Sequence, residues 1–346
     1  MSNPSIFISV AAYQDPYLWW TIDSAWKNAT NPERLHFSVV DQCVESQRES
    51  TRAMPWASHV RYVHLHPRYA RGPCWARALA YSLWSGEKYL LQIDSHMWFQ
   101  KGWDVQLVQE HVAASLQAGH PRQILTTYPG AFVFKDGQPE TAGSPTDTLV
   151  LRPNPEAKLT PSTPVMMFRA VPVVSKSRIP GYHLGAGCLF AEGSLLQDVP
   201  YDPWLYFHGE EQNLAVRAWT RGWDIWHPPT MPILHLYKEG GGKEIVHWSP
   251  DEDAMRDFRW GELQARAEQR MVHLLYSQTL KGAYGLGTAR TLDDFALASG
   301  IDYNKKQVNH EYQIPVPLPP APINFSPFGA APFAPQVQVD FSIKKA

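Results

Sequence analysis

The chain has 346 residues, a formal net charge of -2 and three cysteines, Cys43, Cys74 and Cys188. The near-neutral charge argues against a protein that coats nucleic acid, and the cysteines indicate neither a disulfide framework nor a thiolate zinc site. Because the sequence shows neither a basic leader nor an apolar window of about 18 residues, we expect a cytoplasmic protein without membrane contact.

Short apolar runs alternate with helix-like stretches in the first part of the chain. This rhythm predicts an α/β fold with a mostly parallel central sheet, whose ligands bind beyond the carboxyl ends of the strands. We expect strands at 6–11, 36–40, 60–64 and 89–93, and helices at 17–28 and 73–85.

Asp94 and His96 follow the apolar run 89–93 directly, with Ser95 between them. Side chains two residues apart in an extended segment point the same way, so the carboxylate and the imidazole can share one cation. This oxygen and nitrogen pair suits Mn²⁺ or a similar ion, whose open positions could hold the oxygens of a nucleotide diphosphate. The alternative is an Asp that opens a turn beside a surface His.

The middle of the chain is expected to hold a helix at 103–117 and a strand at 123–127. Residues 129–164 are rich in Pro, Gly and Thr and predict an irregular insertion, acting as a lid or an acceptor-facing loop. A strand at 165–174 follows. The next motif is a glycine pair before an apolar strand, which lets a ligand or another backbone approach closely unless it forms a bulge or tight turn; its residues are Gly185, Ala186 and Gly187.

Glu210 and Glu211 begin a helical pattern. In the first turn they face whatever lies at that helix end, although ordinary compensation of the helix dipole is the alternative. His235 lies in the strand-like run 231–237, where a lone histidine is more often structural than a ligand.

The C-terminal part begins with the residue types of a helix start, Ser249, Pro250 and Glu252, which predict one helix from 249 to about 276. A short helix is expected at 291–299. Residues 313–335 carry too many prolines for a packed helix or a central strand. We therefore expect a domain over 1–278 and an extension with a Pro-rich tail over 279–346.

Several motifs, taken together and in this order, resemble a known family. They are Gly72 to Arg77, the Asp94-Ser95-His96 triplet, Gly185 to Gly187, Gly209-Glu210-Glu211 with Arg217 and Trp219, and His235. Over residues 5–275 the chain resembles the UDP-GlcNAc:polypeptide hydroxyproline N-acetylglucosaminyltransferases, and more distantly the polypeptide N-acetylgalactosaminyltransferases. The resemblance implies a GT-A fold, a Rossmann-like fold of nucleotide-diphospho-sugar transferases.

The resemblance also implies an activity. The enzyme would move a sugar, GlcNAc above all, from UDP to a hydroxyl of a protein or peptide, with retention at the anomeric carbon. Asp94, His96 and His235 would bind Mn²⁺ or Mg²⁺ together with oxygens of the UDP diphosphate. Glu210 or Glu211 would hydrogen-bond sugar hydroxyls or orient the acceptor.

By the same resemblance a larger set would bind the UDP-sugar donor. Tyr13 would stack on the base and Asp15 would bond the base or ribose, unless Asp15 merely starts a helix. Arg77, ahead of Arg71, would meet phosphate or uracil oxygens, unless either pairs with a surface acid. The whole set is Ala11, Tyr13, Asp15, Arg71, Arg77, Asp94, Ser95, Gly185, Ala186 and Gly187.

Two other function classes stay open at this point. One is a non-catalytic sugar-binding or protein-binding module of the same fold. The other is a metal-dependent hydrolase, although such sites usually gather a second metal cluster. For a transferase, the acceptor could also be a small molecule or a modified nucleobase.

Overall fold

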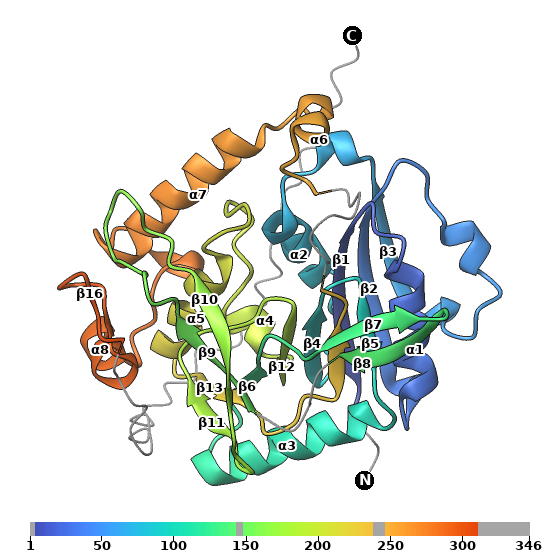
Figure 1. Ribbon diagram of the computed structural model, residues 1–346, viewed down its shortest axis with the longest axis horizontal. Helices are drawn as coiled ribbons and strands as arrows, with labels where there is room; N and C mark the ends of the chain where they lie inside the picture. The colour runs from blue at the N-terminus through green and yellow to red at the C-terminus, as the bar shows by residue number, and fades with distance from the viewer. Residues whose placement is uncertain (1–3, 143–147, 238–245, 311–346) are drawn as a thin grey trace.

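The computed structural model describes residues 4–142, 148–237 and 246–310 (Figure 1). Its centre is an eight-stranded sheet. The strands of this sheet are β1 (Ile6–Tyr13), β2 (Leu35–Gln42), β3 (Val60–Leu65), β4 (Tyr89–Ile93), β6 (Gln123–Thr126), β11 (Ile179–Gly181), β12 (Cys188–Glu192) and β13 (Asp224–His227).

The strands lie in the order β11-β13-β6-β12-β4-β1-β2-β3. β1 to β4 pair in parallel, as do β6 and β13. β12 runs antiparallel to both β4 and β6, and β11 runs antiparallel to β13. The predicted α/β fold with a mostly parallel sheet is confirmed.

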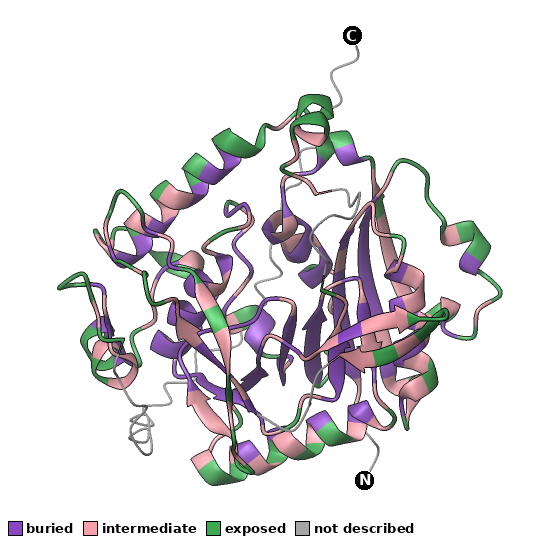
Figure 2. Ribbon diagram, in the orientation of Figure 1, coloured by how far each residue is buried: buried purple, intermediate pink, exposed green. Residues whose placement is uncertain are grey.

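Helices cover both faces of the sheet (Figure 1). Alternate residues of β1 point to opposite faces: Phe7 joins a buried cluster with α2, α5 and α7, and Ile8 joins another with α1 and α3. The strands are buried throughout the centre (Figure 2). The helices are α1 (Leu18–Asn28), α2 (Pro73–Tyr81), α3 (Trp103–Ala118), α4 (Leu195–Asp198), α5 (Glu210–Thr220), α6 (Pro250–Met255), α7 (Trp260–Leu275) and α8 (Leu292–Ser299).

Smaller sheets lie beside the main one. A four-stranded sheet has the order β5-β14-β7-β8, and two further pairs are β10-β9 and β15-β16. The bounds are β5 (Met97–Phe99), β14 (Ile233–His235), β7 (Ala131–Lys135), β8 (Gln138–Ala142), β9 (Thr148–Pro153), β10 (Phe168–Val173), β15 (Ile301–Asp302) and β16 (Gln307–Val308).

The expectation of an irregular insertion over 129–164 is wrong for much of its length, because β7, β8 and β9 fall inside it. β7 and β8 form a hairpin whose turn residues, Asp136 and Gly137, both have positive φ, 50° and 75°. An Asp-Gly pair with positive φ at both positions is a favoured two-residue hairpin turn. The glycine marked a hairpin rather than irregular chain.

The single helix expected over 249–276 is also wrong, since α6 and α7 are separate helices. Arg256, which ends α6, has extended backbone angles (φ -90°, ψ 148°). The carboxylate of Asp253 accepts from Arg256 Nη2 at 2.7 Å and from the backbone N–H of Trp260 at 2.6 Å. Asp253 thus binds the first turn of α7, and Ser249 makes no side-chain cap.

The short helix expected at 291–299 is confirmed as α8. Its Phe295 packs edge-on against Trp219 of α5, with ring centroids 5.3 Å apart, and both belong to one buried cluster with Tyr303. The extension after residue 278 therefore packs onto the domain at least to that point, and the domain boundary stays a prediction. The Pro-rich segment 313–335 lies outside the described residues. Among those described, no helix is long and apolar enough to span a membrane.

Candidate active site

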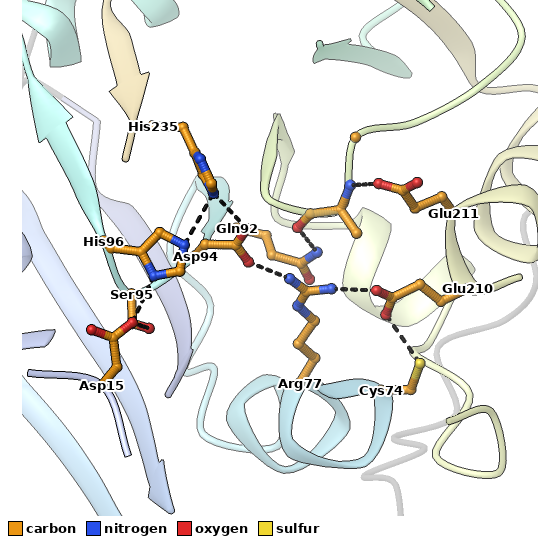
Figure 3. A network of polar contacts seen from close by, with 12 residues as sticks. Asp15, Cys74, Arg77, Gln92, Asp94, Ser95, His96, Glu210, Glu211 and His235 are labelled. Atoms are coloured by element: carbon orange, nitrogen blue, oxygen red, sulfur yellow. Dashed lines mark hydrogen bonds and ion pairs between the residues drawn. The ribbon is translucent and has the colours of Figure 1, made fainter. Parts of the chain in front are cut away.

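The candidate site lies at one edge of the main sheet. Asp94 follows the carboxyl end of β4, and Gly187 precedes the amino end of β12, which meets the same edge because β12 runs antiparallel. The first turn of α5 brings Glu210 and Glu211 to this edge, and β14 brings His235 (Figure 3). All five residues line one cavity of about 300 Å³. The edge is where an open α/β sheet is expected to bind ligands.

Asp94, His96 and His235 form a cluster in which one ligand atom from each residue lies within 4.8 Å of the others. His235 Nε2 lies 3.1 Å from His96 Nε2 and 3.3 Å from Asp94 Oδ2. These are the three residues expected to bind a metal, and one carboxylate with two imidazoles is a suitable donor set for a divalent cation.

Asp15 orients this cluster from behind. Its Oδ2 lies 2.6 Å from His96 Nδ1 and accepts from Ser95 Oγ at 2.6 Å, while Oδ1 accepts from the backbone N–H of Tyr17 at 2.8 Å. A carboxylate on one ring nitrogen fixes the tautomer, and His96 Nε2 is then the nitrogen offered to a cation. The structure therefore places Asp15 against His96 and the Ser95 hydroxyl against Asp15, whereas the resemblance implies that both residues bind the donor.

The charge of Asp94 is set by its neighbours. Burial alone would raise the pKa of its carboxyl group, but the hydrogen bond with His235 and the charge of Arg77 hold that pKa well below its usual range. Arg77 Nη2 lies 2.7 Å from Asp94 Oδ1. Asp94 is therefore ionised at neutral pH, as a cation ligand must be.

Arg77 joins Asp94 to Glu210 (Figure 3). Its Nη1 lies 2.8 Å from Glu210 Oε1, and both residues are buried, with 5% and 4% exposed. Glu210 Oε2 accepts from Tyr201 Oη at 2.9 Å and from Cys74 Sγ at 3.0 Å. Burial raises the pKa of Glu210 despite the opposing charge of Arg77. Glu210 lines the cavity, but these contacts use its oxygens to hold Arg77.

Glu211 is the more open of the two acids, with 26% of its side chain exposed. Its Oε1 accepts from the backbone N–H of Ala186 at 2.7 Å, and its Oε2 accepts from Tyr128 Oη at 2.6 Å. The Ala186 carbonyl in turn accepts from Gln92 Nε2 at 2.7 Å. The amide of Ala186, which the sequence assigned to the donor, is thus bound to Glu211.

The glycines flanking Ala186 are required by close approach. A Cβ on Gly187 would lie 2.4 Å from Asp94 Oδ2, and one on Gly185 would lie 2.4 Å from the carbonyl oxygen of Thr127. The expected close approach is present, and the neighbours are a candidate metal ligand and another stretch of backbone.

Three further residues were expected to bind the nucleotide, and none of them is among the described residues that line the cavity. Tyr13 Oη donates to Glu252 at 2.7 Å, and burial raises the pKa of Tyr13. The guanidinium of Arg71 stacks 4.1 Å from the ring centroid of Phe258, and burial lowers its pKa. Ala11 packs beside the small buried cluster of β2 and α2. The structure does not bring these three residues to the Asp94 cluster.

Four residues of the site were not predicted from the sequence, Gln92, Tyr128, His183 and Tyr201, and neither was Glu252, the partner of Tyr13. Tyr128 had a usable signal, because it follows a predicted strand just as Asp94 does and the carboxyl ends of parallel strands meet at one edge. Glu252 had none, since 239 residues separate it from Tyr13.

The family of the chain follows from a sequence comparison. A family model described as Glycosyltransferase (GlcNAc) matches residues 5–55 and 45–305. The chain belongs to the GlcNAc glycosyltransferase family. The family expected from the motifs is confirmed at this level. A search of curated proteins finds no match.

Two solved structures are similar to this GlcNAc glycosyltransferase family member. A structure described as GalNAc-T7 with UDP, GalNAc and Mn²⁺ has a TM-score of 0.59 at 13% identity, over 90% of this chain and 59% of that one. A structure described as S. aureus TarS 1-349 with UDP-GlcNAc has a TM-score of 0.39 at 13% identity, over 78% of this chain and 72% of that one. This chain thus spans little more than half of the GalNAc-T7 chain. The expected GT-A fold is confirmed.

Proposed function

We propose that this protein is a metal-dependent glycosyltransferase that moves a sugar, GlcNAc, from UDP to a hydroxyl of a protein or peptide. The observation that carries the proposal is the meeting of Asp94, His96 and His235 in a member of this family. A non-catalytic binding module has no need of a cation site beside two acids, and the described residues hold no second metal cluster of the kind many hydrolases use.

The three residues fit a divalent cation. The fit rests on an ionised carboxylate, on a His96 ring whose Nδ1 already bonds Asp15, and on a His235 Nε2 that faces both other ligands. A cation held there supplies positive charge opposite the diphosphate oxygens of the leaving UDP. GalNAc-T7, solved with UDP, GalNAc and Mn²⁺, supports the same combination for this chain.

Other residues of the chain position Asp94 and bind the donor sugar. Arg77, fixed by Glu210, holds Asp94 in place and brings a buried positive charge to the cavity wall. Glu211 lines the cavity, where its carboxylate can accept a hydrogen bond from a hydroxyl group of the donor sugar. The cavity of about 300 Å³ has room for one hexosamine.

Three features of the proposal stay predictions. The peptide or protein acceptor and retention at the anomeric carbon come from the resemblance, and the third feature, the cytoplasmic location, comes instead from the lack of a basic leader and of a long apolar window in the sequence. Retention is read from the anomeric proton coupling of the product, and location from cell fractionation.

The experiment is a donor screen that measures UDP release from a panel of UDP-sugars with and without Mn²⁺. We expect turnover that is highest with UDP-GlcNAc, requires the cation and disappears in Asp94→Ala. Mass spectrometry then searches candidate acceptors for an added N-acetylhexosamine. Unaltered turnover in a folded Asp94→Ala protein would refute the proposed site.

A further inference from the structure

The hydroxyl group of Tyr128 lies inside the candidate active site and donates a hydrogen bond to Glu211. Tyr128 lines the cavity, and its Oη lies 2.6 Å from Glu211 Oε2. Burial and the charge of Glu211 raise the pKa of Tyr128, so the phenol stays protonated and donates the hydrogen bond. A hydrogen bond to a charged group contributes more than a neutral one.

Glu211 is held from three directions. The Ala186 amide bonds Oε1, while Tyr128 and His183 approach Oε2, with His183 Nε2 at 3.4 Å. His183 is itself fixed by stacking on Phe168, with ring centroids 3.4 Å apart. A carboxylate offers about four acceptor positions. Hydrogen bonds from Ala186 and Tyr128 take two of them, and His183 Nε2 lies near Oε2 as well, so about one or two remain for a ligand in the cavity.

This arrangement differs from that of Glu210. Glu210 is 4% exposed and bonds a cation, a phenol and a thiol, Arg77, Tyr201 and Cys74. Glu211 has no Arg or Lys among the partners that hold it, and part of its side chain faces the cavity. The hydrogen bonds that fix its direction come from the Ala186 amide and the Tyr128 phenol, and that of Tyr128 is the shorter.

We propose that Tyr128 is a positioning residue for donor-sugar selectivity: it fixes Glu211 so that one acceptor position meets one hydroxyl of the sugar. This inference rests on the proposed function and names the part of the site that reads the sugar. A site built to hydrogen-bond a hydroxyl rejects a sugar that places that hydroxyl elsewhere, because the buried polar group is then left unpaired. Without the hydroxyl group of Tyr128, the Glu211 carboxylate can rotate and accept a hydrogen bond from the sugar hydroxyl in either position.

The test compares Tyr128→Phe with Tyr237→Phe. Tyr237 also lines the cavity, but its hydroxyl donates to the backbone carbonyl of Pro129 at 2.9 Å instead of to an acid. The substrates are UDP-GlcNAc and UDP-GalNAc, which differ in the direction of one sugar hydroxyl. We measure kcat and KM for both, together with the affinity for UDP alone.

We expect Tyr128→Phe to lower the kcat/KM ratio of the preferred sugar over the other by about tenfold or more. UDP affinity should stay within about twofold of wild type, and Tyr237→Phe should keep the wild-type ratio. Because Tyr128 acts through Glu211, its effect should largely vanish in a Glu211→Gln background, which is the non-additivity of a double-mutant cycle.

Four results would overturn the inference. A wild-type ratio near one, an unchanged ratio in Tyr128→Phe, or additive effects with Glu211→Gln would each remove the selectivity role while leaving the proposed transferase intact. A wild-type protein that turns over no UDP-sugar would refute the proposed function and the inference with it.

Discussion

Replacing Gly187 with alanine tests whether the Asp94 carboxylate must keep its present place. The added Cβ would lie 2.4 Å from Asp94 Oδ2 and 3.0 Å from its Cγ, whereas real Cβ contacts stay beyond 3.0 Å. The carboxylate must therefore shift by at least about 0.6 Å. Arg77 and His235 hold it where it is, so the shift also weakens these two contacts.

We expect the variant to fold, with a loss of about 1–3 kcal/mol in the free energy of unfolding from overpacking. Its Mn²⁺ affinity in the presence of UDP should fall by about 10–100-fold, the usual cost of disturbing the support of a ligand. Calorimetric titration of both variants with Mn²⁺ gives the measurement. Gly130→Ala is the matched control, because its Cβ would meet only Leu234 at an ordinary 3.9 Å. Equal Mn²⁺ affinity in the two variants would refute the reasoning.

Three further substitutions give separate outcomes. In metal-free protein, the lowered pKa of Asp94 stabilises the fold at any pH above the pKa of the unfolded chain, which is near 3.8. This stability is lost as the pH falls. Between pH 5 and pH 3 the free energy of unfolding should therefore drop less in Asp94→Asn than in wild type. Glu210→Gln removes the negative charge that faces buried Arg77 and should lower the free energy of unfolding by about 3 kcal/mol, as measured by chemical denaturation. A loss below about 1 kcal/mol would contradict the role of Glu210 as the partner of Arg77. Arg71→Ala should leave UDP affinity within about threefold, because Arg71 stacks on Phe258 outside the cavity; a larger loss in titration would return Arg71 to the nucleotide site.

The sheet and one half of the site could be predicted from the sequence. Apolar runs of strand length give the positions of β1 to β4 and β6 along the chain, and a carboxylate directly after β4 lies at the binding edge by a general rule of α/β folds. Asp94 and His96 follow from these local patterns. Glu210 and Glu211 follow from the start of a helix, although their different roles depend on partners such as Tyr201 and Tyr128, which are distant in sequence.

His235 could not be found from local patterns. In isolation it is a histidine in an apolar strand, and only the resemblance to a family marked it as a ligand. The structure supplies the physical reason: β14 pairs antiparallel with β5, so that His235 lies opposite Met97 and next to His96. His96 and His235 are 139 residues apart in the sequence, so their meeting leaves no local sequence signal.

The errors share a cause. Pro and Gly content over 129–164 was taken for irregular chain, although Asp136 and Gly137 are the residues of a tight hairpin turn. The helix expected over 249–276 was inferred from the helix-start residues Ser249, Pro250 and Glu252, and its break depends on Asp253 binding the backbone of Trp260. In both cases a local turn decides the structure against the expectation.

Anomalous diffraction from a crystal grown with Mn²⁺ and UDP tests the central claim most directly. We predict one strong peak at the manganese edge, about 2.0–2.2 Å from Asp94 Oδ2, His96 Nε2 and His235 Nε2, as is usual for such ligand atoms, with UDP oxygens beside it. A manganese peak elsewhere, or UDP bound with no metal at these three residues, would contradict the account.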